Sequence, residues 1–200
     1  MLANRLKRIV IGILLLVIVW CVLTILQHDD YTVCAYEQDF EPVAVAEETA
    51  EEVAGRRIRK VWFAPGAPQT MTQAQYRAEV IAGLKTISEV TATDFQESAS
   101  SAGAYIKFYV FTKADFWKKW PSLAREKIVP LGRSAGNSIY FTDNPRIVGW
   151  VRACTIHETG HRVGIGHSPD PASIMFWTLP VKTMSQADKV KFQQKLGKPQ

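Results

Sequence analysis

The stretch that decides the fold runs from residue 157 to residue 167 and reads His157-Glu158-Thr159-Gly160-His161-Arg162-Val163-Gly164-Ile165-Gly166-His167. Histidines four residues apart lie one turn apart on one helix face, so His157 and His161 can direct nitrogens at one ion. Gly164 tolerates a positive φ, which lets the chain turn sharply and return His167 as a third ligand. Three imidazoles with an open position are typical of a catalytic zinc, and Glu158 can reach a water there.

This run resembles the extended zinc signature of the metzincins, and its surroundings are similar to the matrixins within that group. The resemblance places the methionine that lies beneath the metal at Met175, in Ser173-Ile174-Met175. Ser168 directly after the third histidine is matrixin-like. The resemblance covers about residues 56–197, and its further segments are 167–175, 184–188 with 196–197, and more weakly 87–95.

The resemblance implies an α+β, metzincin-like zincin fold. It consists of a twisted, mostly parallel sheet with two long helices, and of a small C-terminal subdomain that contains the methionine turn. It also implies a zinc endopeptidase in which Glu158 is the general base, with substrate extended along an edge strand within residues 122–132. Phe176, Trp177 and Leu179 either line the specificity pocket or form ordinary core beneath the turn.

Several features depart from the matrixin pattern. The propeptide switch Pro-Arg-Cys-Gly is absent, and Cys34 lies in an unrelated context, so we expect activity without removal of a pro-segment. Outside the run only His28 remains, and Asp115 is the one aspartate in residues 112–136. We therefore expect one catalytic zinc and neither a second, structural zinc nor structural calcium.

Local patterns predict the elements around the run. Alternation predicts strands at 58–63, 105–111 and 138–141. Thr72 and Gln75 form a capping box before an amphipathic helix. Asn144 and Pro145 predict the start of a helix that continues to about Val163, and a last helix starts at Ser185.

The N-terminal residues predict a membrane segment. Residues 1–8 carry Arg5, Lys7 and Arg8, and residues 9–26 are apolar apart from Gly12 and Thr24. Eighteen helical residues span about 27 Å, close to the thickness of a bilayer core. A single-pass signal anchor with a cytoplasmic N-terminus and a cleaved signal peptide both remain open. In either case the rest of the chain lies outside the cytoplasm.

Charge divides the remaining chain. Residues 27–55 contain nine acids and no Lys or Arg, which indicates a flexible acidic tether, whereas the domain predicted at 56–200 is strongly basic. The basic surface is either a solvated face or attracts anionic partners.

Three cysteines exclude a disulfide scaffold, and pairing of Cys34 with Cys154 stays open. No nucleic-acid motif is present, and we expect a monomer that acts on a protein or peptide.

Two other functions remain compatible with the sequence. One is a membrane-anchored, zinc-containing module that binds peptides without cleaving them. The presence of Glu158 argues against it, because a binding module has no chemical need for a base at that position. The other is a zinc hydrolase that acts on a non-peptide amide.

Overall fold

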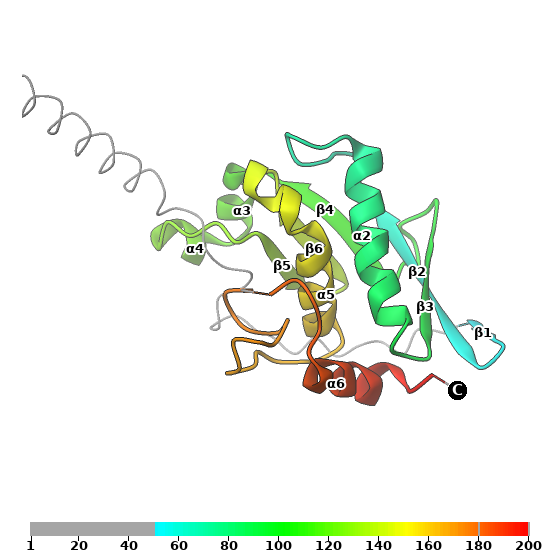
Figure 1. Ribbon diagram of the computed structural model, residues 1–200. Helices are drawn as coiled ribbons and strands as arrows, with labels where there is room; N and C mark the ends of the chain where they lie inside the picture. Colours follow the sequence, from blue (N-terminus) through cyan, green and yellow to red (C-terminus); the bar gives the residue numbers. More distant parts are fainter. Residues whose placement is uncertain (1–50, 180, 200) are drawn as a thin grey trace, which may run out of the picture. The chain divides into compact units, whose positions relative to one another are not determined.

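Six strands form one sheet in the computed structural model, which describes residues 51–179 and 181–199 (Figure 1). The elements are, in chain order, β1 (Glu51–Val53), β2 (Arg56–Phe63), α2 (Gln73–Ser88), β3 (Thr93–Glu97), β4 (Ile106–Phe111), α3 (Lys113–Lys119), α4 (Pro121–Arg125), β5 (Gly132–Ala135), β6 (Ser138–Thr142), the 3₁₀ helix η2 (Pro145–Gly149), α5 (Val151–Arg162) and α6 (Gln186–Leu196). The predicted mixture of helices and strands is confirmed.

The strand order is β1-β2-β4-β6-β5, and β3 pairs with β2 as well. The pairs β2–β3, β2–β4 and β4–β6 are parallel, whereas β1–β2 and β5–β6 are antiparallel. The sheet is therefore parallel at its centre, as predicted, and β5 forms one of its edges.

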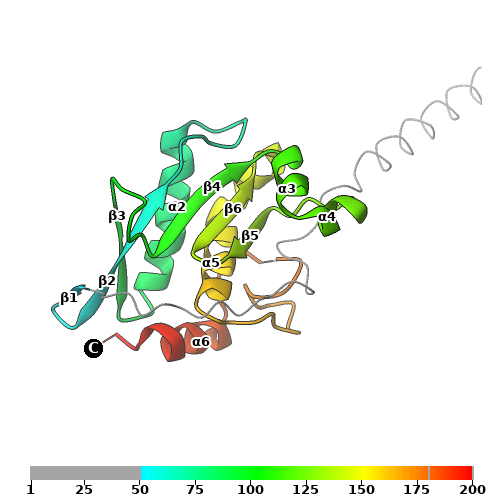
Figure 2. The same ribbon diagram turned by 180° about the vertical axis from the view of Figure 1, so that it is seen from behind.

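The two long helices, α2 and α5, cover the same face of the sheet (Figures 1 and 2). The core beneath them is built from alternate strand residues that are almost completely buried: Val61, Phe63, Ile106, Phe108, Ile139 and Phe141. The apolar positions predicted for the first helix are buried too: Tyr76, Val80, Leu84 and Ile87. A Cβ added at Gly83 would lie 2.8 Å from the carbonyl oxygen of Arg152, so α2 and α5 pack closely at this glycine.

The ends of the helices follow the local signals. Thr72 and Gln75 form the predicted capping box of α2, and Ser185 caps α6 with Asp188 as the third helical residue.

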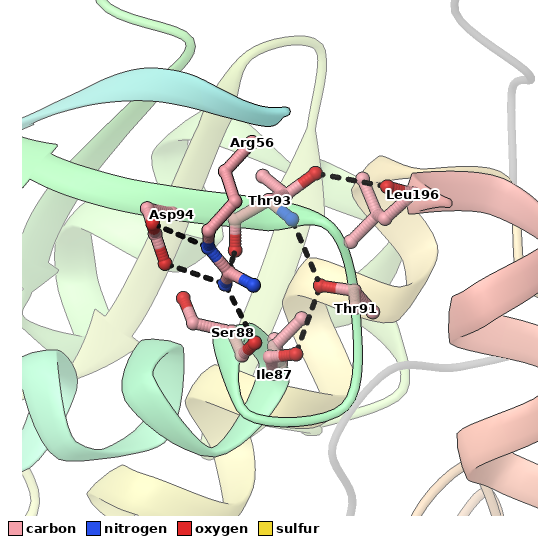
Figure 3. A network of polar contacts seen from close by, with 7 residues as sticks. All are labelled: Arg56, Ile87, Ser88, Thr91, Thr93, Asp94 and Leu196. Atoms are coloured by element: carbon pink, nitrogen blue, oxygen red, sulfur yellow. Dashed lines mark hydrogen bonds and ion pairs between the residues drawn. The ribbon is translucent and has the colours of Figure 1, made fainter. Parts of the chain in front are cut away.

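The connection between α2 and β3 ties the C-terminal helix to the sheet (Figure 3). The hydroxyl of Thr93 donates to the carbonyl of Leu196 at 3.0 Å, at the end of α6. The guanidinium of Arg56 donates to both carboxylate oxygens of Asp94, at 2.6 and 2.7 Å, and to the carbonyl of Ser88. The start of β2, the end of α2 and the end of α6 thus meet in one polar network.

Three expectations about elements need correction. The helix predicted from Asn144 to about Val163 is interrupted at Trp150, whose amide bonds back to Ile147 and closes a 3₁₀ turn. The edge strand expected within 122–132 begins only at Gly132, because Pro121 opens the short helix α4. Strand β1, at residues 51–53, lies inside the predicted tether, so ordered structure begins before residue 56.

The predicted segments 1–8 and 9–26, most of the tether, His28 and Cys34 lie outside the described residues. Among the described helices, none combines the length and the apolar character needed to cross a bilayer. Cys154 is buried in α5. Its pairing with Cys34 and the membrane segment both stay predictions.

Candidate metal centre

Helix α5 carries the first two histidines of the motif and ends directly after them. His157 is completely buried and His161 is 7% exposed. Gly164 has a φ of +81°, the left-handed conformation expected from the sequence. The amide of Ile165 bonds to the carbonyl of Gly160 at 2.8 Å, which closes the end of the helix. This turn starts the chain on its return toward the metal-binding face.

Backbone carbonyls fix the orientation of both helical histidines. Nδ1 of His157 lies 2.7 Å from the carbonyl oxygen of Ile174, and Nδ1 of His161 lies 2.9 Å from that of Ile165. A carbonyl oxygen can only accept, so each Nδ1 carries the proton and each neutral ring presents an Nε2 lone pair. Such a partner on the second nitrogen is the usual support of a metal-binding imidazole.

The three Nε2 atoms converge at a spacing that fits zinc. Nε2 of His161 lies 3.0 Å from that of His157 and 3.2 Å from that of His167. Ligands at zinc–nitrogen distances of 2.0–2.1 Å in a tetrahedron are about 3.3 Å apart. Within the described residues this is the one cluster of three or more His, Cys, Asp or Glu side chains that can hold a metal. The residues present therefore fit a catalytic zinc site.

Burial keeps the helical histidines in the form that binds a metal. It lowers the pKa of His157 to about 4, although the bond to Ile174 acts in the opposite direction. Burial also holds the pKa of His161 well below its ordinary value. Because metal ligands must be unprotonated, these histidines are ready to coordinate at neutral pH.

Glu158 is completely buried beside the histidines. Burial raises its pKa to about 8, and the charge of Arg133 and the amide of Ser134 lower it by smaller amounts. Neither carboxylate oxygen has a hydrogen-bond partner of good geometry among the described residues. A buried carboxyl group without strong partners is suited to exchange a proton with a reacting group.

The segment Ser173–Met175 lies against the end of α5, where the resemblance placed the methionine turn. Met175 is completely buried, and a Cβ added at Gly160 would lie 2.5 Å from its sulfur. The amide of Ser168 donates to the carbonyl of Met175 at 2.9 Å, which holds the residues after His167 beside this turn.

A buried aspartate on α6 fixes this turn from the other side. The carboxylate of Asp188 accepts from the amide of Ile174 at 2.9 Å, and it also accepts from the hydroxyl of Ser173. Ser185 donates to the same carboxylate with its amide and its hydroxyl, at 2.9 and 2.8 Å. Because the carbonyl of Ile174 accepts from His157, Asp188 supports the first metal ligand through the backbone of one residue.

Residues on β5 also shape the site, and sequence reasoning did not single them out. A Cβ at Gly132 would lie 3.1 Å from Cγ of Glu158, so the edge strand passes close to the proposed base. Arg133 is 5% exposed, with its guanidinium over the ring of Trp120 at 4.9 Å. These contacts join residues distant in sequence, and no local pattern marks them.

The three candidate pocket residues differ in environment. Trp177 is 49% exposed and Leu179 is 3% exposed, while Phe176 is half-buried with its ring centroid 5.9 Å from that of Trp177. Leu179 therefore belongs to the core beneath the turn, which was one of the two alternatives that the sequence left open. Trp177 does not, and its ring is accessible beside the methionine turn.

Comparison with known proteins agrees with this geometry. The family model of the matrixins matches residues 61–195, a span that contains the three histidines, Met175 and Asp188. No curated protein matched the chain.

Proposed function

The chain belongs to the matrixin family of zinc metalloendopeptidases, and from this premise we propose that it cleaves an extracytoplasmic protein or peptide with Glu158 as general base. The observation that carries the proposal is the convergence of three Nε2 atoms next to a buried carboxyl group.

The chemistry divides between the metal and the chain. Zinc, when held by the three histidines, supplies a Lewis acid that polarises the scissile carbonyl, lowers the pKa of water and favours the ionised form of Glu158. Glu158 takes the proton of the attacking water at a carboxylate oxygen and returns it to the leaving amine. Its burial keeps bulk water from competing for that proton.

Substrate binding is proposed along the free edge of β5. Among the described strands β5 pairs with β6 alone, so its other edge can accept an extended peptide by strand addition. Gly132 brings this edge within contact distance of Glu158. The exposed ring of Trp177 is the part of the predicted pocket best able to contact an apolar substrate side chain.

The extracytoplasmic location rests on the sequence of residues 1–26. A signal anchor predicts that the protein stays with membranes after alkaline extraction and that added protease reaches only the part after residue 26. Release of a soluble, shortened chain would instead support the signal peptide.

Glu158→Gln tests the proposed base. We expect the variant to bind zinc but to lose activity by about 10²–10⁴-fold, because the amide cannot accept a proton. Peptide-library cleavage by the purified protein, with and without a chelator, supplies the assay. Glu126→Gln changes an exposed glutamate and serves as control. Wild-type turnover by Glu158→Gln would refute the assignment.

A further inference from the structure

The segment between β4 and β5 forms a basic lobe to which the proposed mechanism assigns no step. We define this basic lobe as residues 113–127, which contain α3 and α4. Its five cations, against Asp115 and Glu126, are Lys113, Lys118, Lys119, Arg125 and Lys127. Both views place α3 and α4 away from α6 (Figures 1 and 2).

The lobe is anchored by an apolar interior. Phe116 is completely buried and Leu123 is 2% exposed. The ring of Phe116 lies edge-on against Phe111 of β4, with centroids 5.8 Å apart. The indole of Trp117 donates to the carbonyl of Ile128 at 3.0 Å, which fastens α3 to the chain that leads into β5. The lobe therefore presents its outer face as a fixed surface.

That outer face is cationic. The exposed positions include Lys118, Lys119, Arg125 and Lys127. The two acids of the lobe, Asp115 and Glu126, are exposed as well, and Asp115 forms a capping box with the N-cap Thr112, whose hydroxyl donates to its carboxylate at 2.7 Å. The solvent-facing surface of the lobe therefore carries more positive than negative charge.

Two tryptophans lie among these cations. Trp117 and Trp120 are both partly exposed. The ammonium of Lys113 lies 4.3 Å from the centroid of the Trp117 ring, and that of Lys119 lies 5.4 Å from the Trp120 ring. Indole rings beside ammonium groups are typical of surfaces at a membrane–water boundary, where one part of the side chain meets headgroups and the other meets apolar material.

We propose that the basic lobe binds the surface of a bilayer that contains anionic lipid headgroups. The four lysines and Arg125 match the phosphates, and the two indoles match the boundary beneath them. A soluble polyanion would satisfy the charges but would have no apolar layer to meet the exposed parts of the indole rings. The proposal concerns a different surface from the metal centre and does not depend on the nature of residues 9–26.

The expected strength follows from the charge. Each basic residue close to an anionic bilayer contributes about a fivefold gain in affinity, and the gain declines with added salt. Because such gains multiply, reversal of two lysines should weaken lipid contact by at least about 25-fold.

Hydrogen–deuterium exchange of the full-length protein tests the proposal. The protein is mixed with vesicles of phosphatidylcholine alone, or of phosphatidylcholine with phosphatidylglycerol, and exchange is followed in residues 113–127. We expect slower exchange on the anionic vesicles, and we expect K118E/K119E to need at least about 25-fold more lipid for the same protection. R125E/K127E reverses two charges at and just after the end of α4, and it should weaken lipid binding to a similar extent. K85E/K198E reverses two exposed lysines elsewhere and should retain the wild-type response.

Several results would overturn the proposal. Equal protection on both kinds of vesicle would show that charge is not recognised, and absence of protection on either kind would show that no lipid binds there. An equal loss in K85E/K198E would assign the effect to net charge. Protection by heparin or polyglutamate, without protection by vesicles, would assign the lobe to a soluble polyanion.

Discussion

The part of the chain from β1 to α5 and the part after Gly164 are stabilised in different ways. In the first part, apolar side chains of parallel strands pack under two helices, as in the contacts among Phe63, Phe108 and Phe141. The second part contains α6 and few other regular elements. Its apolar residues, such as Ile174, Met175 and Phe192, join the same core, and polar contacts of Asp188 add to this packing near the metal centre.

Because of this difference, substitutions in the two parts should affect different quantities, the free energy of unfolding in one case and the geometry of the metal centre in the other. Many side chains share the packing of the strands and α2, so we expect one substitution there to change the free energy of unfolding more than the positions of the ligands on α5 and after it. In the second part a single carboxylate connects α6, the methionine turn and His157. Substitutions that remove these contacts should therefore lower zinc affinity strongly while they change the free energy of unfolding only modestly.

Asp188→Ala should give the largest effect. Loss of the carboxylate leaves the amide of Ile174 and the hydroxyl of Ser173 without their acceptor, which frees the carbonyl that orients His157. Loss of such outer contacts typically lowers metal affinity about 10–100-fold. Competition with a chromophoric chelator measures this affinity.

Asp115→Ala is the matched control. Asp115 forms the same kind of capping box, with Thr112 at the start of α3, but it has no contact with the methionine turn in the described residues. We expect a loss of about 1 kcal/mol in stability or less and unchanged zinc affinity. Equal zinc affinities for the two variants would contradict the role of Asp188.

Gly83→Ala and Gly160→Ala, both in the first part, compare its internal packing with its packing against the second part. A Cβ at Gly83 meets the backbone oxygen of Arg152 and must separate the helices, so we expect about 1–3 kcal/mol of destabilisation with unchanged zinc affinity. A Cβ at Gly160 meets the sulfur of Met175 at 2.5 Å and should reduce both stability and zinc affinity. Denaturant unfolding and chelator competition measure the two quantities. Weaker zinc binding by Gly83→Ala would show that the parts are coupled.

Low pH should destabilise the second part by protonating the carboxylate of Asp188. Burial raises the pKa of this carboxyl, but the bonds from Ser173, Ile174 and Ser185 outweigh burial and lower the pKa below its ordinary value. A lowered folded pKa gives stability that is present above the unfolded pKa of about 3.9 and lost as pH falls through the folded value. In zinc-free protein, Asp188→Ala should therefore lose less stability than wild type below about pH 4. Parallel acid titrations would contradict this assignment.

Met175→Leu should have the smallest effect. The site of Met175 is completely buried, and leucine has similar volume, so we expect a loss below about 1.5 kcal/mol with zinc retained. Complete loss of zinc from a folded variant would show that the sulfur contributes more than packing.

Signals between near neighbours in sequence predicted much of this fold. Capping boxes marked the starts of α2 and α6, because donor and acceptor are three residues apart. The strand at Thr93–Glu97 was not predicted, since its mixed polar sequence lacks clear alternation and it is defined by pairing with β2. Helix α4 was missed for a related reason, since five residues are too few to show a helical period.

The sequence by itself determined the metal centre, because the spacing of His157, His161 and His167 around Gly164 specifies a helix, a turn and three converging rings. It also determined the starts of α2 and α6 and the buried face of α2. Only the tertiary structure decided that Leu179 is buried while Trp177 is exposed, that Gly132 adjoins Glu158, and that Asp188 reaches Ile174 as well as Ser185. The physical reason is range: a spacing of three or four residues fixes geometry within one helix, whereas contacts between separate segments depend on how the whole chain packs.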